Sequence, residues 1–196
     1  MINFKEAFIM SSSEKKKMSA KDMAFTGMFA AVIAVLSQIA IPLPSGVPVT
    51  LQTFAVALAG YTLGMKLGGL SAIVYVLIGA VGVPVFSGFK GGLGSLTGPT
   101  GGFIWGFIIM ALLCGLGTDT GRKIPAIALG IAGLLICHLC GAAQFTVIKD
   151  GGFLSSVMLV CVPYLLKDFI SVGLAFGLAL ILRSRVNITK KAKAEV

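Results

Sequence analysis

Long apolar stretches separated by short polar turns make up most of the chain. A helix needs about 20 mainly apolar residues to cross the hydrocarbon core of a membrane, within a range of roughly 17–25. Six stretches come close to this length, at residues 24–41, 48–65, 67–86, 99–117, 124–148 and 153–182. The pattern therefore predicts an all-α integral membrane bundle of six transmembrane helices.

The second and third stretches are the least clearly separated. Only a small turn around Met65, Lys66 and Leu67 separates them, so a single long bent helix is an alternative. Gly64, Gly68 and Gly69 favour a turn, because glycine adopts backbone conformations that interrupt a helix. We therefore expect two helices joined by a tight turn.

Basic residues gather at the two ends of the chain and in alternate short loops. If the N-terminus lies in the cytoplasm, the only basic residues outside cytoplasmic segments are Lys90, Lys149 and Lys167. Cytoplasmic flanks of membrane helices carry an excess of Lys and Arg, so we expect both termini in the cytoplasm. The resulting division is a basic N-terminal segment at 1–23, a membrane domain at 24–182 and a basic tail at 183–196.

The overall composition agrees with a membrane protein and excludes several other classes. Hydrophobic residues make up 57% of the chain and charged residues 12%, and the mean hydropathy is +1.00. Soluble domains carry about 25% charged residues. A soluble enzyme, a disordered segment and a nucleic-acid-binding domain are therefore excluded, despite a net charge of +9. The chain also lacks a Gly-x-x-x-x-Gly-Lys-Ser/Thr phosphate loop, so we expect no ATP binding by that route.

Small residues recur at the four-residue spacing that lets two helices approach closely. The expected role of each such strip is packing within the bundle. The strips are Gly60/Gly64/Gly68, Gly98/Gly102/Gly106, Gly173/Gly177, and the group Gly27, Ala30, Ala31 and Ala34 in the first span.

Two loops on the predicted outer side carry most of the candidate binding residues. Residues 42–52 are rich in proline, and residues 82–103 are too rich in glycine for a regular helix, which suits a mobile lid. A merely flexible external loop is the alternative. The candidate ligand-binding residues in these loops are Thr50, Gln52, Phe86, Gly88, Lys90, Gly91, Gly92 and Thr100.

The last span contains Lys167 and Asp168, the polar pair whose placement within the membrane costs the most free energy. A carboxylate at that depth should face the bundle or a watery cavity. Neighbouring helical residues point about 100° apart, so we expect these two side chains not to share a face. A polar anchor at the membrane boundary is the alternative.

His138 with Cys137 and Cys140 resembles a fragment of a metal site, but a core histidine is the favoured interpretation and we expect no metal. Tyr75 and Gln144 are further polar-tipped residues that are candidates for the lining of a pocket.

Four motifs carry a resemblance to a known family. They are Val47–Thr53, Gly79–Gly88, the pair Gly91-Gly92, and Gly98–Phe103. Together they resemble the BioY family, the biotin-binding S components of energy-coupling factor (ECF) transporters. The resemblance covers about residues 24–182 and implies a six-helix bundle in the cell membrane of a bacterium or archaeon, surrounded by lipid, with a biotin site near the outer face.

The resemblance also implies partners. These are a transmembrane coupling subunit (EcfT) and two cytoplasmic ECF ATPases, with biotin as the transported ligand, no cofactor and no nucleic acid. The small residues Ala30 and Ala34, with Gly27 and Ala31, match the family's contact with the coupling subunit.

One motif departs from the family pattern, which is similar to Gly-Asp-x-x-Lys in the last span. Asp168 is kept, but Lys167 stands at the glycine position and Ser171 at the lysine position. The group that binds the biotin carboxylate is then Lys90, Lys167 or a neutral donor such as Ser171, and we expect Lys90.

The expected function is therefore biotin binding for ATP-driven uptake, without enzymatic activity. The alternatives are a self-sufficient secondary carrier for a small carboxylate-bearing vitamin and a structural or channel-like bundle.

Overall fold

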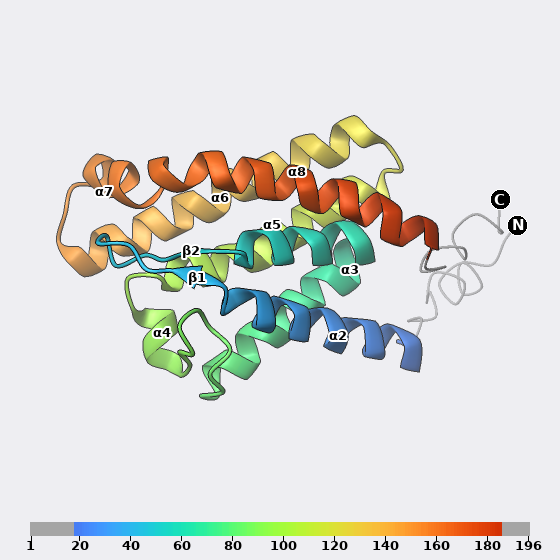
Figure 1. Ribbon diagram of the computed structural model, residues 1–196, viewed down its shortest axis with the longest axis horizontal. Helices are drawn as coiled ribbons and strands as arrows, with labels where there is room; N and C mark the ends of the chain where they lie inside the picture. Colours follow the sequence, from blue (N-terminus) through green and yellow to red (C-terminus); the bar gives the residue numbers. More distant parts are fainter. Residues whose placement is uncertain (1–17, 186–196) are drawn as a thin grey trace, which may run out of the picture.

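The computed structural model describes residues 18–185, so most of the predicted basic segments at 1–23 and 183–196 lies outside the described residues. The described part is a helical bundle with one small β-hairpin (Figure 1). Its elements are α2 (Ala20–Ser37), β1 (Ala40–Ile41), β2 (Val49–Thr50), α3 (Gln52–Ala80), α4 (Leu93–Thr97), α5 (Gly101–Asp119), α6 (Lys123–Lys149), α7 (Phe153–Val160) and α8 (Val162–Arg185).

The helix α3 turns back on itself at Gly64. The backbone of this residue leaves the helical conformation, with φ 81° and ψ 178°, a conformation that favours glycine. Beyond the turn the two arms pack closely, since a Cβ added to Gly68 would lie only 2.7 Å from the Cα of Gly60. The sequence predicted a turn at this boundary, and the structure places it at Gly64.

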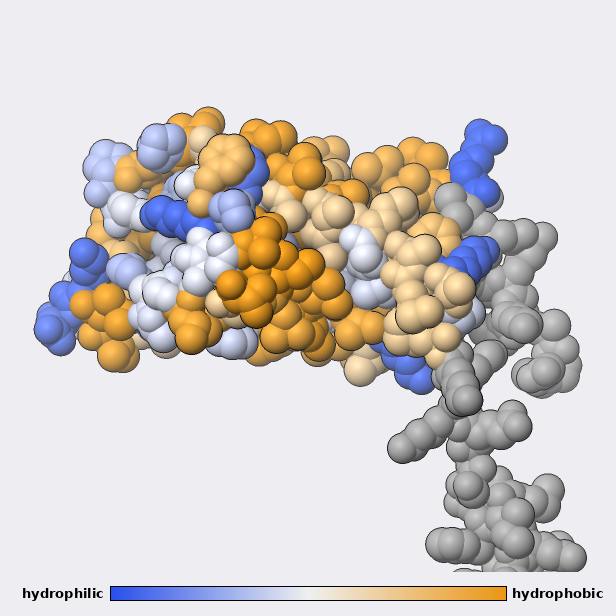
Figure 2. Space-filling view, turned by 90° about the horizontal axis from the view of Figure 1, so that it is seen from below, coloured by the Kyte–Doolittle hydropathy of each residue, from blue (hydrophilic) through white to orange (hydrophobic). Residues whose placement is uncertain are grey.

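Five described helices, α2, α3, α5, α6 and α8, are long and apolar enough to cross a membrane. The prediction was six, and the number differs because the second and third predicted spans are the two arms of α3. Apolar side chains cover much of the middle of the face in Figure 2, with hydrophilic residues gathered toward its ends. These features make the chain a multi-pass membrane protein.

The prediction of one helix for the last span is wrong in its first part. The structure has two helices there, α7 and α8. The chain breaks at Cys161, between α7 and α8. Pro163 explains the break, since proline has no N–H to donate within a helix and fits only in its first turn. The glycine-rich loop also differs from its prediction, because it contains the short helix α4.

Two of the glycine strips pack helices together as expected. A side chain on Gly102 would overlap the carbonyl oxygen of Cys140, and one on Gly106 would lie 2.7 Å from the Cα of Cys137. The strip of α5 therefore brings α5 and α6 into backbone contact. The strip at Gly173 and Gly177 differs, since both glycines face open space.

The small residues of α2 are divided between two faces. Ala30 is buried in the core of the bundle and Ala34 packs partly against it. Gly27 and Ala31 are exposed. Of the four residues predicted to contact a partner, only these two lie fully on the open surface of the helix.

Polar contacts join three helices at the end of the bundle where α2 begins and α8 ends (Figure 1). Asp119, at the end of α5, accepts the Met65 N–H at 2.9 Å, just after the Gly64 turn. Arg183 donates to the Tyr61 carbonyl at 3.2 Å and lies 3.8 Å from the Asp119 carboxylate. The β-hairpin and α4 lie at the opposite end of the bundle.

Candidate functional site

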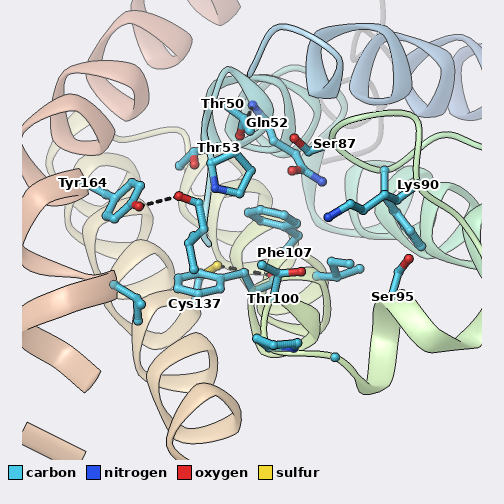
Figure 3. Close-up of a pocket in the computed structure, with 18 of the residues that line it drawn as sticks. Thr50, Gln52, Thr53, Ser87, Lys90, Ser95, Thr100, Phe107, Cys137 and Tyr164 are labelled. Atoms are coloured by element: carbon cyan, nitrogen blue, oxygen red, sulfur yellow. Dashed lines mark hydrogen bonds between the residues drawn. The ribbon is translucent and has the colours of Figure 1, made fainter. Parts of the chain in front are cut away.

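A cavity of about 360 Å³ lies at the end of the bundle that carries the β-hairpin and α4. Its wall is built from the hairpin, the glycine-rich segment, the first turns of α3 and α5, the middle of α6, and α8 (Figure 3). Ligand pockets usually measure about 300–1,000 Å³ and combine an apolar lining with a few placed polar groups. This cavity fits that description.

One face of α8 supplies the polar floor of the cavity. Tyr164, Lys167 and Asp168 are spaced i, i+3 and i+4, which places them on one side of a helix, and all three line the cavity. The Lys167 ammonium contacts the Asp168 carboxylate and donates to the Thr50 carbonyl at 2.7 Å. The expectation that Lys167 and Asp168 point apart is therefore wrong, because the long lysine stem lets the ammonium reach back to its neighbour.

His138 lies against the same carboxylate. Its Nε2 is 3.0 Å from Asp168 Oδ2, and the two side chains are 7% and 5% exposed. The Nδ1 atom has no hydrogen-bond partner, and the ring packs edge-on against Phe103 with centroids 5.7 Å apart. His138 is thus a buried histidine, as favoured from the sequence, but it also lines the cavity, which the sequence did not predict.

A metal site is not supported by the residues around His138. No group of three His, Cys, Asp or Glu side chains within the described part of the chain is arranged to hold a metal ion. The nearby thiols bond to carbonyls instead, with Cys137 Sγ 3.5 Å from the Phe103 oxygen and Cys161 Sγ 3.4 Å from the His138 oxygen.

The first loop is tied to the helices beneath it. The hairpin pairs Ala40 with Thr50, and the hydroxyl of Tyr164 on α8 donates to the Val47 carbonyl. Gln52, at the start of α3, lines the cavity and donates its side-chain amide to the hydroxyl of Tyr75. These contacts fix one side of the cavity mouth.

The other side of the mouth is a tight turn at residues 85–90, which we call the lid turn. The Phe86 ring is buried, packs edge-on against Tyr75 at 5.5 Å, and occupies the space that a side chain at Gly79 would need. Lys90 extends into the cavity from the side opposite Tyr164 (Figure 3). The two candidate cations, Lys90 and Lys167, thus approach the cavity from different walls.

Eight of the predicted ligand-binding residues line the cavity. They are Thr50, Gln52, Phe86, Lys90, Gly91, Thr100, Lys167 and Asp168. The other four, Tyr75, Gly88, Gly92 and Gln144, are absent from the lining.

Three of these four residues support the cavity lining through contacts outside the cavity. Tyr75 bonds to Gln52, and Gln144 donates to the carbonyls of Leu96 and Gly98 at 2.8 Å each, which fixes the end of α4. Gly92 opens α4 with a φ of 84°. These residues therefore support the lining without forming part of it.

The structure adds lining residues that the sequence analysis did not name as binding residues. They include His138, Tyr164, Thr53, Ser87, Ser95, Phe103, Phe107 and Cys137. A usable signal existed for Tyr164, which lies one helical turn before Asp168, and for His138, one of very few ionisable residues within an apolar stretch. Ser87 and Ser95 carried no comparable signal, because their inward position depends on the folding of the glycine-rich segment.

Comparison with known proteins identifies the family. The sequence model described as "BioY family" matches residues 11–188, which is most of the chain. The chain belongs to the BioY family.

Two relatives within the BioY family match the chain over different shares of its length. The chain is 38% identical over 165 residues to a probable biotin transporter BioY of Pyrococcus horikoshii, covering 83% of this chain and 96% of that protein. It is 47% identical over 116 residues to the biotin transporter BioY of Thermotoga maritima, covering 59% of this chain and 68% of that protein.

A solved structure shares the fold of this chain. The crystal structure of the S-component for biotin from an ECF-type ABC transporter superposes with a TM-score of 0.77 at 23% identity, over 86% of this chain and 95% of that one. The likeness supports the helical arrangement described above.

Proposed function

We propose that this protein is the substrate-binding S component of a biotin uptake system and is not an enzyme. The support is its membership of the BioY family, in which relatives that match over most of their length are named as biotin transporters. The structural observation that carries the proposal is the cavity at one end of the bundle, with a buried Asp168 between His138 and Lys167 on its floor.

The chemistry of the cavity suits the two ends of biotin. The ureido ring offers N–H donors, and a buried carboxylate is a strong acceptor for them. Asp168 is such a carboxylate and lines the cavity. The apolar part of biotin would then lie against aromatic rings such as Phe103 and Phe107.

The biotin carboxylate needs a cation or several donors when it leaves water. Lys167 is already engaged by Asp168 and by the Thr50 carbonyl. Lys90 extends into the cavity from the lid turn, and no hydrogen bond or ion pair holds its ammonium group within the described part of the chain. Lys90 is therefore the proposed partner of the biotin carboxylate.

The proposed topology places six spans in the cell membrane, with both termini in the cytoplasm. The two arms of α3 count as separate spans, and the positively charged loops lie inside. The described chain begins and ends at the same end of the bundle, opposite the cavity, which supports an outward-facing site (Figure 1).

The proposed partners are the transmembrane coupling subunit EcfT and two ECF ATPases. The chain has no phosphate loop of its own, so the energy for release must come from elsewhere. The exposed small residues Gly27 and Ala31 on α2 would let a partner helix approach closely.

Uptake into proteoliposomes tests the energy source. We expect labelled biotin to accumulate only when the coupling subunit and ATPases are present with ATP inside. Accumulation by the protein alone, driven by an ion gradient, would favour a self-sufficient secondary carrier. Few ionisable side chains lie within the apolar stretches, which gives little material for the relay such a carrier needs.

A further inference from the structure

Gln38 joins the end of α2 to the lid turn, far away in the sequence. Its Nε2 lies 3.0 Å from the carbonyl oxygen of Val85 and 3.2 Å from that of Phe86. Its Oε1 accepts the Phe89 N–H at 2.9 Å. One side chain therefore satisfies backbone acceptors and a backbone donor of the lid turn together.

The lid turn needs such support because its conformation is unfavourable in isolation. Phe89 has a φ of 57°, in the left-handed region that residues other than glycine rarely adopt. The turn is closed by paired hydrogen bonds between Phe86 and Lys90, at 2.9 and 3.2 Å. The N–H group that donates to Gln38 Oε1 belongs to Phe89, the strained residue itself. This hydrogen bond therefore offsets part of the strain.

The lid turn forms one side of the cavity mouth. The β-hairpin forms the other side, and it follows directly after the end of α2. Phe86, Ser87 and Lys90 line the cavity from the lid turn. Directly after Gln38 the chain enters β1, which pairs with β2, and the Leu51 N–H donates to the Ile39 carbonyl at 3.2 Å. Both covers of the cavity are thus attached to the end of α2. One is attached through the backbone, and the other through Gln38 and the Ser37 hydroxyl, which also donates to the Val85 carbonyl at 2.5 Å.

The helix α2 is suited to move as a unit. Among the described helices it makes extensive contact with α3 alone, and it lies at the edge of the bundle (Figure 1). A peripheral helix held by one neighbour shifts more easily than one packed on several sides. Its outer face carries the exposed Gly27 and Ala31.

We propose that the side chain of Gln38 links the lid turn to the end of α2, so that a shift of α2 opens the ligand cavity. We call this link the clasp. The inference rests on the proposed function and specifies how the same site is regulated. A partner that favours the shifted position of α2 would thereby favour the open cavity. Gln38 is a positioning residue, since it is not part of the cavity lining.

Hydrogen exchange in the ligand-free protein tests the clasp without reference to biotin. The variant Gln38→Met keeps the length of the side chain and removes its amide. We expect amide exchange in residues 85–90 to accelerate about 10- to 100-fold, because each hydrogen bond lost changes an equilibrium by about 2- to 12-fold. Exchange in α5 and α6 should stay unchanged. Unchanged exchange in the lid turn would overturn the proposal.

The matched control is Thr97→Val, which removes a hydrogen bond of similar kind on the same cover. The Thr97 hydroxyl donates to the Leu93 carbonyl within α4, and within the described part of the chain no hydrogen bond joins it to α2. We expect this variant to leave exchange in residues 85–90 unchanged. Equal acceleration in both variants would show general loosening of the cover and would contradict a specific clasp.

Biotin kinetics then tests the link to ligand release. In Gln38→Met we expect the dissociation rate of labelled biotin to rise by about 10-fold or more, and the association rate to rise with it, so that the dissociation constant changes less than either rate. An unchanged dissociation rate would overturn the link between lid turn and cavity. Absence of biotin binding in the unsubstituted protein would instead refute the proposed function, and the exchange experiment would still decide the clasp.

Discussion

At the scale of single residues, the Asp168 carboxylate joins the polar groups of the cavity floor, since it contacts both Lys167 and His138. Asp168 was predictable because an aspartate deep in an apolar stretch is costly and needs a cavity or partners. Lys167 was placed wrongly because helical spacing gives the direction of Cβ, whereas the position of an ammonium depends on four flexible methylene groups. The structure joins Lys167 to Asp168 and to the Thr50 carbonyl.

The roles of Lys90 and Lys167 can be separated by ligand charge. Lys90→Ala should weaken biotin binding about 10- to 150-fold, because a hydrogen bond to a charged group contributes roughly 1.5–3 kcal/mol. It should weaken biotin amide, which lacks the carboxylate, far less. Lys167→Ala should weaken both ligands alike, since it removes the ammonium group that contacts the Asp168 carboxylate. Isothermal titration with the two ligands measures both effects, and a charge-dependent loss in Lys167→Ala alone would reverse the assignment.

His138 gives a second prediction at this scale. His138→Ala should weaken both biotin and biotin amide about 10-fold or more, because it removes the hydrogen-bond partner of a buried carboxylate in the cavity wall. Cys140→Ala is the control, since Cys140 lies on the same helix outside the cavity lining. Binding by His138→Ala that equals the control would show that the histidine has no part in the site.

At the scale of elements, apolar length predicted the helices well and their interruptions poorly. The windows at 99–117 and 124–148 differ from α5 and α6 by two residues or fewer at each end. The break at Cys161 was missed because the hydropathy stays high across it, although Pro163 marks the first turn of a new helix. The helix α4 was missed because a five-residue helix depends on local hydrogen bonds, such as that from Ser95 to the Gly91 carbonyl.

The turn within α3 makes a prediction about stability. Gly64→Ala should lower the melting temperature by about 2–12 °C, because the backbone region that Gly64 occupies is essentially restricted to glycine and costs an L-residue about 1–3 kcal/mol. The new methyl group would also meet the Asp119 carboxylate. Gly173→Ala is the matched control, since nothing lies within 4 Å of an added Cβ there. Thermal unfolding in detergent measures both, and equal melting temperatures would show that the turn carries no such constraint.

At the scale of the whole molecule, the sequence predicted at which end of the bundle each loop lies. It predicted less well which side chains contact each other. The alternation of basic and neutral loops agrees with the arrangement of the structure, in which the cavity lies opposite the two ends of the described chain (Figure 1). The surface of α2 was less predictable, because four small residues close in sequence turn out to face both the core and the exterior.

A bulky residue on α2 should separate binding from transport. Ala31→Trp adds an indole to an exposed position, so we expect biotin binding to the isolated protein to stay within about twofold and ATP-dependent uptake to be abolished. Ala30→Trp should instead impair folding, because Ala30 is 3% exposed within the core. Proteoliposome uptake beside titration measures the difference, and full uptake by Ala31→Trp would place the partner on another face.

The most direct test of the central claim is isothermal titration of the purified protein with biotin, in the absence of any partner or ATP. The cavity predicts saturable binding at one site per chain, with strong selection of biotin over vitamins that lack its ureido ring, and loss of that binding in Asp168→Ala. Absence of biotin binding, or equal binding by Asp168→Ala, would contradict the proposal that this cavity is the biotin site.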